Sequence, residues 1–284
     1  MALPSHNIRI VSFNVLASEY SRFNTDSGSH ESDTAATERW QRIADLLAGD
    51  LAADVIALLE ATLPFVRFLA TVGGSDPDAV AENAVFSISI GQTSYCAAVA
   101  LRRGKPDGAA LLWKADVLDL VDESTYGIIP VHFTAATRTP RMALVGLFTV
   151  AHAPADAGIL AIAATHLEGN PRRSDVRAAQ LVELASAMHN AAIALHPTDA
   201  EDKTTFVIAG DFNHSLARID GLDAALAPLG LTRLTGDDIA ITFTQHNSRS
   251  DSGPIQKTID HMPARRLATG SRRPRRPLPR SLAV

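Results

Sequence analysis

Polar residues stand directly at the ends of five apolar, β-prone stretches of the chain. They are Asn14, Glu60, His166, the pair Asp211 and Asn213, and Asp260. Burying an unpaired carboxylate inside a strand is costly, whereas strand ends in layered folds converge, so that polar groups placed there can meet. Taken singly, each residue has an ordinary role in a turn, at a solvated rim or in a core. Taken together, they predict one functional site.

These residue types permit metal-assisted hydrolysis of a phosphate ester, although they do not select it. Mg²⁺ prefers oxygen ligands and needs only one or two protein carboxylates. A bound metal ion neutralises phosphate charge and lowers the pKa of its water, and a further carboxylate can orient or deprotonate that water. Amide and imidazole N–H groups can stabilise the negative charge that develops on phosphoryl oxygens.

The stretches that carry these residues alternate with helical patterns. Ser174 and Asp175 predict the start of a helix that continues through Leu195, and Glu38–Leu51 predicts a second helix. Residues 73–94 have few long apolar runs and predict a surface excursion. Strands mixed with helices indicate an α/β or α+β fold.

Composition excludes several classes of protein. The chain has 284 residues, of which 46% are hydrophobic and 20% charged, and this balance suits one large globular domain. The single cysteine, Cys96, excludes an internal disulfide framework, and the net charge of −5 gives no general case for a polyanion binder. No stretch has the length of a membrane span, and residues 1–9 lack the pattern of a secretory signal. We therefore expect an intracellular protein, in the cytoplasm.

The composition changes sharply near the end of the chain. No acidic residue follows Asp260, and residues 262–284 hold seven arginines and four prolines. We therefore expect a globular domain over residues 1–262 and an irregular tail over residues 263–284. A solvated tail, a nucleic-acid-binding arm and a shifted reading frame would each give this composition.

Several short motifs occur in the order in which one hydrolase family carries them. They are Ser12-Phe13-Asn14-Val15-Leu16-Ala17, Leu59-Glu60, Thr165-His166-Leu167, Gly210-Asp211-Phe212-Asn213 and Thr258-Ile259-Asp260-His261. In these motifs, residues 8–262 resemble the endonuclease/exonuclease/phosphatase superfamily of metal-dependent phosphoesterases. The segment 107–114 and the path from Thr165 to Gln180-Leu181 resemble its deadenylase branch, which contains carbon catabolite repression 4-like proteins, Angel and nocturnin.

The resemblance implies a fold and a role for each site residue. The implied fold is a four-layer α/β sandwich, two face-to-face β-sheets flanked by helices. Glu60 would be the principal ligand of Mg²⁺, with Mn²⁺ as an alternative ion, and Asn14 would help to hold the metal or its waters. The implied catalytic residues are Asp211, which acts on the attacking water, Asn213 and His166, which bind phosphoryl oxygens, and Asp260, which orients a histidine.

The chain departs from the family pattern at two places. Family members usually carry a later Ser-Asp-His motif, but no Asp or His follows His261 here. Asp260 is therefore expected to be the orienting residue without its histidine partner; alternatively, Asp260 and His261 are themselves the terminal catalytic pair. In addition, Leu59 stands where the family commonly has a glutamine that could support the metal site.

The leading hypothesis for function is a Mg²⁺-dependent phosphodiester hydrolase. The resemblance implies a deadenylase-type 3′-exoribonuclease that acts on an RNA 3′ end, impaired by the missing terminal motif. One alternative is a phosphoesterase for DNA, a phosphoinositide, a sphingolipid or a nucleotide. Another is a catalytically dead fold that serves as a binding scaffold. Arg102, Arg103 and Lys105 either face a phosphate backbone or form a solvated surface turn.

Overall fold

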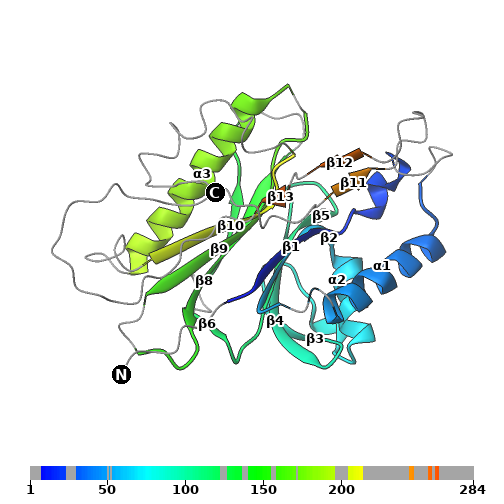
Figure 1. Cartoon of the computed structure of the whole chain (residues 1–284), viewed down its shortest axis with the longest axis horizontal. Coiled ribbons are helices and arrows are strands. Elements are labelled where there is room, and N and C mark those ends of the chain that lie inside the picture. Colours follow the sequence, from blue (N-terminus) through cyan, green and yellow to red (C-terminus); the bar gives the residue numbers. More distant parts are fainter. Residues whose placement is uncertain are drawn as a thin grey trace.

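Two β-sheets lie face to face in the computed structural model, and helices cover their outer faces (Figure 1). The structure describes residues 8–23, 30–49, 51, 53–121, 127–135, 140–154, 158–170, 172–195, 204–213, 243–245, 255–257 and 260–261. The four-layer α/β sandwich predicted from the sequence is confirmed. The tail expected over residues 263–284 lies outside the described residues.

The first sheet has the strand order β1-β2-β5-β4-β3. Its strands are β1 (Ile10–Asn14), β2 (Val55–Thr62), β3 (Val85–Ile90), β4 (Thr93–Leu101) and β5 (Asp107–Trp113). β1 and β2 run parallel, whereas the other neighbouring pairs are antiparallel. Every residue of β2 and β5 is buried, as is typical of central strands that are covered on both faces.

The second sheet has the order β13-β10-β9-β8-β6, and β7 also pairs with β8. Its strands are β6 (Leu118–Leu120), β7 (Ile128–His132), β8 (Met142–Val150), β9 (Ile159–His166), β10 (Thr204–Asp211) and β13 (Asp260–His261). β9 and β10 run parallel. A Cβ atom at Gly210 would overlap the carbonyl oxygen of Thr165, so glycine permits the close approach of β9 and β10 just before Asp211.

Among the described residues, Lys257 and Asp260 belong to two different strands. Lys257 ends β12 (Ile255–Lys257), which pairs with β11 (Phe243–Gln245) in a separate two-stranded sheet. Asp260 instead begins β13, which pairs with β10. Asp260 therefore lies at the edge of the second sheet, beside the strand that ends in Asp211.

In the described part of the chain, three α-helices cover the sheets on opposite sides (Figure 1). α1 (Asp33–Ala48) and α2 (Leu63–Val72) pack on the first sheet, and α3 (Ser174–Leu195) packs on the second. α3 has the predicted bounds. α1 begins at Asp33 rather than Glu38, because the Ser32 side chain caps the helix by accepting a hydrogen bond from the Ala35 amide. None of the described helices is long and apolar enough to cross a membrane.

The surface excursion expected over residues 73–94 is wrong. This segment contains the short helix η2 (Pro77–Ala79) and β3, and Phe86, Ile88 and Ile90 of β3 are buried under α1 and α2. Apolar and polar residues alternate in this strand, a period of two that marks a half-buried β-strand even without a long apolar run.

The core between the sheets holds them in a fixed relative position. It contains Val55 and Leu111 from the first sheet and Phe148 and Ile162 from the second. The rings of Trp113 and Phe148 meet across the layers with centroids 5.2 Å apart. The interlocked core places the end of β1 beside β10 (Figure 1), and the strand ends there carry the polar residues singled out in the sequence.

Candidate active site

Four strand ends bring four of the predicted site residues together. Asn14 ends β1 and Glu60 lies near the end of the parallel strand β2. His166 ends β9 and Asp211 ends the parallel strand β10, and these two residues are partners in the register. Parallel strands end on the same edge of their sheet, and the two sheets pack with these edges adjacent.

The side-chain amide of Asn14 joins the two sheets at this edge. Its Nδ2 donates to Oε1 of Glu60 at 3.1 Å and to Oδ2 of Asp211 at 3.1 Å. Its Oδ1 accepts a hydrogen bond from the backbone amide of Leu16 at 2.9 Å, and this contact fixes the orientation of the amide group. One side chain therefore holds two carboxylates from different sheets close to each other.

A backbone irregularity directs Glu60 toward this cluster. The register of β2 and β5 shifts between Leu59 and Ala61, and Glu60 has a φ of 54°, in the left-handed region. A bulge of this kind re-aims a side chain, and a non-glycine residue in this conformation costs on the order of 1 kcal/mol. The carboxylate is only 9% exposed, and its Oε2 accepts from the Ala17 amide at 3.2 Å. The strained backbone at Glu60 thus places a buried carboxylate in the cluster.

His166 lies between the two carboxylates. Its Nδ1 is 3.4 Å from Oε1 of Glu60, and its Nε2 is 3.7 Å from Oδ2 of Asp211. Burial, followed by the positive charges of Arg141 and Arg102, holds the pKa of His166 well below the ordinary value of 6.5. The imidazole is therefore neutral near neutral pH, with one N–H to donate and one nitrogen to accept.

Asn213 completes the described cluster from the loop after β10. Its backbone amide donates to Oδ1 of Asp211 at 2.8 Å, and its Nδ2 donates to the carbonyl of Leu167 at 3.0 Å. The residue has a φ of 53°, which asparagine tolerates better than most residues. No contact among the described residues uses the second N–H of its amide, which can donate to a ligand.

The remaining predicted residue, Asp260, lies opposite Asp211 in the antiparallel register of β13 and β10, and His261 lies opposite Gly210. The backbone thus places residue 260 next to the cluster. The segment expected to lack the Ser-Asp-His motif lies outside the described residues, and the roles assigned to all six residues stay predictions.

Residues 11–278 match the Endonuclease/Exonuclease/phosphatase family. The chain belongs to this family. Its members are hydrolases that generally depend on a divalent metal ion. The superfamily predicted from the ordered motifs is therefore confirmed. Among curated proteins, none matches the chain.

Solved structures that share the fold include two proteins of the branch suggested by the motifs. ANGEL2, described as a 2′,3′-cyclic phosphatase in complex with adenosine-2′,3′-vanadate, is 20% identical with a TM-score of 0.55, over 78% of this chain and 58% of its own. The human Nocturnin catalytic domain with a bound sulfate anion is 18% identical with a TM-score of 0.54, over 81% and 72%. TDP2 from C. elegans is 14% identical with a TM-score of 0.52, over 90% and 63%. The chain thus spans little more than half the length of the ANGEL2 chain.

The family's dependence on a metal ion suits the donor set around Glu60 and Asp211. Burial raises the pKa of both carboxyl groups, so their negative charges are unfavourable as they stand. Among the described residues, neither carboxylate forms an ion pair with a lysine or arginine. The titratable side chain that contacts both of them is His166, which is neutral. Two carboxylates that an amide holds together are sufficient protein ligands for Mg²⁺, which keeps several waters.

A tighter metal cage is absent from the described part of the chain, where no group of three or more His, Cys, Asp or Glu side chains has metal-binding geometry. Mg²⁺ seldom uses such all-protein cages. Glu60 and Asp211 are the described carboxylates that could hold the ion, and Asn14, the other predicted metal ligand, is hydrogen-bonded to both of them.

Arg102 has neither of the two roles expected from the sequence. It neither faces solvent nor is free to bind a phosphate backbone, because only 5% of it is exposed and its Nη2 donates to both oxygens of Asp107 (2.6 Å to Oδ2). The same Nη2 donates to the Tyr20 hydroxyl at 2.8 Å, and that hydroxyl donates to Asp107 at 3.0 Å. Asp107 pairs with Thr62 in the register of β5 and β2, so this network supports the strand just beyond the Glu60 bulge.

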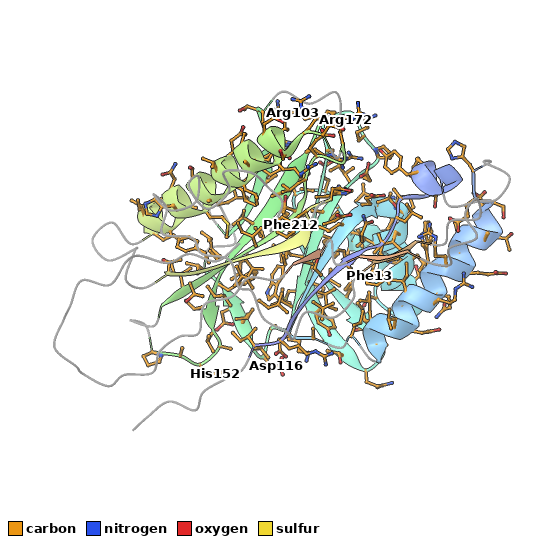
Figure 2. The ribbon with its side chains drawn as sticks, turned by 45° about the horizontal axis from the view of Figure 1, so that its top comes forward. Phe13, Arg103, Asp116, His152, Arg172 and Phe212 are labelled. Atoms are coloured by element: carbon orange, nitrogen blue, oxygen red, sulfur yellow. The ribbon has the colours of Figure 1, made fainter. Side chains whose placement is uncertain are left out.

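Replacing Asp107 with asparagine is expected to destabilise the protein by about 3 kcal/mol, because it leaves the buried charge of Arg102 without its partner. Chemical denaturation of the variant, with the exposed Asp116→Asn as the matched control, measures this effect. Figure 2 shows Asp116 at the opposite end of the molecule from Arg103, the neighbour of Arg102. Equal stabilities for the two variants would contradict the structural role of the network.

The depressed pKa of His166 predicts a loss of stability in acid. Because the folded-state pKa lies below the unfolded value of 6.5, the unfolded chain takes up this proton first. The stability that the neutral His166 contributes is complete above pH 6.5 and is lost as the pH falls from there through the folded-state pKa. In EDTA, the free energy of unfolding should fall more steeply between about pH 7 and pH 5 in wild type than in His166→Gln. The exposed His30→Gln is the control and should follow wild type.

Proposed function

We propose that the protein is a Mg²⁺-dependent phosphodiester hydrolase that removes nucleotides from an RNA 3′ end, as deadenylases do. The observation that carries the proposal is the double hydrogen bond from Asn14 to Glu60 and Asp211, because it gathers two buried carboxylates at the junction of the sheets. A cytoplasmic location and a catalytic unit within residues 1–262 are parts of the same proposal.

The proposed chemistry divides the tasks among the cluster residues. When bound at Glu60 and Asp211, a magnesium ion supplies positive charge next to the phosphate ester. Asp211 orients the attacking water and accepts its proton through a carboxylate oxygen. Neutral His166 and the second N–H of the Asn213 amide donate to non-bridging phosphoryl oxygens, where negative charge increases in the transition state.

Exposed cations near the site support a polyanionic substrate. Arg103 and Lys105 lie on the turn between β4 and β5, and Arg172 lies on the loop between β9 and α3; all three are exposed. Figure 2 shows Arg103 and Arg172 at the same end of the molecule. A nucleic-acid backbone would meet positive charge there, whereas a small uncharged substrate would not use it.

The choice of substrate is tested with a panel in the presence and absence of Mg²⁺. We expect release of AMP from a 3′-hydroxyl oligo(A), and no release by Glu60→Gln. The alternative result is hydrolysis of a different substrate of the panel: a DNA oligonucleotide, a phosphoinositide, a sphingolipid or a nucleotide. That result would agree with phosphoesterase activity and would contradict the proposal that the protein is a deadenylase. Because ANGEL2 is a 2′,3′-cyclic phosphatase, a 2′,3′-cyclic phosphate is a further substrate for the panel. Folded protein that binds RNA but hydrolyses none of them would indicate a scaffold.

A further inference from the structure

Arg141 is a cation that neither the motifs nor the family assignment explained. It directly precedes β8, whose first residue, Met142, is the register partner of His166. Arg141 is half-buried, and its Nε is buried without a hydrogen-bond partner. Among the described residues, its guanidinium forms no hydrogen bond and no ion pair. Withdrawing such a strong set of donors from water is costly unless a ligand satisfies them.

The surroundings of Arg141 identify the kind of ligand. A Cβ atom at Gly169 would lie 3.1 Å from its Nη2 and 3.7 Å from Nδ2 of Asn213, so two N–H donors converge on the space that glycine leaves open. Burial, the largest effect, and Arg102 lower the pKa of Arg141, whereas the charges of Glu168, Glu60 and Asp211 raise it. The guanidinium therefore lies near these three carboxylates, but among the described residues it is not paired with any of them.

Backbone contacts on both sides hold Arg141 in this place. Nη1 of Arg102 donates to the carbonyl of Pro140 at 3.3 Å, and the amide of Phe133 donates to the carbonyl of Arg141 at 3.1 Å. The carboxylate of Glu183, on α3, accepts from the amides of Thr134 at 2.7 Å and Ala135 at 2.8 Å. The segments before β8 are thus tied to both sheets, which suits a side chain whose position matters for chemistry.

We propose that Arg141 is a catalytic residue that binds a non-bridging oxygen of the scissile phosphate together with Asn213, in the space beside Gly169. The proposal rests on the proposed phosphodiester hydrolysis and names a residue for it. A planar guanidinium can donate two parallel hydrogen bonds to phosphate, and its charge becomes more effective as the negative charge on the phosphoryl group increases. Arg102 cannot serve in this way, because its Nη2 is committed to Asp107 and Tyr20.

Arg141→Ala, Arg141→Lys and Gly169→Ala test the proposal against Arg42→Ala, an exposed arginine on α1 outside the cluster. With bis(4-nitrophenyl) phosphate and Mg²⁺, we expect Arg141→Ala to lower kcat about 100-fold. Arg141→Lys should recover part of that loss, and Arg42→Ala should match wild type. Gly169→Ala should lower kcat less, because its φ is compatible with alanine and the new methyl group only displaces the end of Arg141.

Binding of inorganic phosphate, measured by calorimetry, provides a readout that does not depend on turnover. We expect Arg141→Ala to weaken it about tenfold, the effect of one charged hydrogen bond, and Arg42→Ala to leave it unchanged. Equal phosphate affinity in wild type and Arg141→Ala, or no phosphate binding by folded wild type, would overturn the proposal. A loss of stability in EDTA with unchanged phosphate affinity would make Arg141 a counter-ion for the carboxylates and would overturn it too.

Failure of this inference and failure of the proposed function give different results. If Glu60→Gln abolishes hydrolysis while Arg141→Ala retains wild-type kcat and phosphate affinity, the proposed phosphodiesterase activity is supported and the proposed role of Arg141 is wrong. If wild type hydrolyses no phosphodiester but binds phosphate through Arg141, the proposed anion site is supported and the proposed enzymatic function is wrong. Circular dichroism establishes in each case that the variant is folded.

Discussion

Replacing Glu60 with glutamine is expected to lower kcat/KM for a phosphodiester by about 1000-fold in the presence of Mg²⁺. Glutamine keeps the size of the side chain and one acceptor for Asn14 or Ala17, but it removes the negative charge that a metal ion needs. The loss should appear mainly in kcat, because the affected charge is greatest in the transition state.

Steady-state kinetics with the exposed Glu19→Gln as the matched control measures this effect, since that substitution makes the same chemical change away from the cluster. The fold should survive in the Glu60 variant, because burial already makes the charged form of Glu60 unfavourable. A Glu60→Gln protein with more than a tenth of wild-type kcat/KM would be incompatible with a metal-binding role for this carboxylate.

Replacing Asp211 with asparagine is expected to lower kcat by about 100- to 10,000-fold, the range for loss of a general base. Asparagine can still accept the hydrogen bond from the Asn213 backbone, which wild type makes at 2.8 Å, but it cannot take a proton from water. Burial raises the pKa of Asp211 in the absence of metal, and a nearby cation lowers it again.

Two measurements distinguish a role of Asp211 as general base from a purely structural role. The acidic limb of the pH–rate profile, which reports ionisation of the base, should disappear in Asp211→Asn but remain in the exposed control Asp116→Asn. KM should change by only a few-fold. If the acidic limb persists unchanged in Asp211→Asn, another group is the base and Asp211 only binds.

Sequence reasoning succeeded where a strand end decides the position of a side chain. Asn14, His166 and Asp211 each follow an apolar run, and parallel pairing brings such residues to one edge. The bulge that turns Glu60 inward could not be predicted, because it depends on pairing with β5, a strand distant in sequence.

The arginines show a second limit of reasoning from local patterns. Arg102 lies in a turn-like segment rich in charge and glycine, yet tertiary pairing with Asp107 and Tyr20 buries it. Arg141 precedes an apolar run rather than following one, so a rule based on the ends of runs missed it. The polar residue at the start of an antiparallel strand lies at the same sheet edge as the end of its neighbour, and this extension of the rule would have found Arg141.

Calorimetric titration of metal-free protein with Mg²⁺ tests most directly whether the strand ends form a cation site. Wild type is expected to bind one ion, and Glu60→Gln is expected to show no binding in the same range while remaining folded. The exposed control Glu19→Gln should bind as wild type does. Equal Mg²⁺ binding by wild type and Glu60→Gln, or none by folded wild type, would contradict the account.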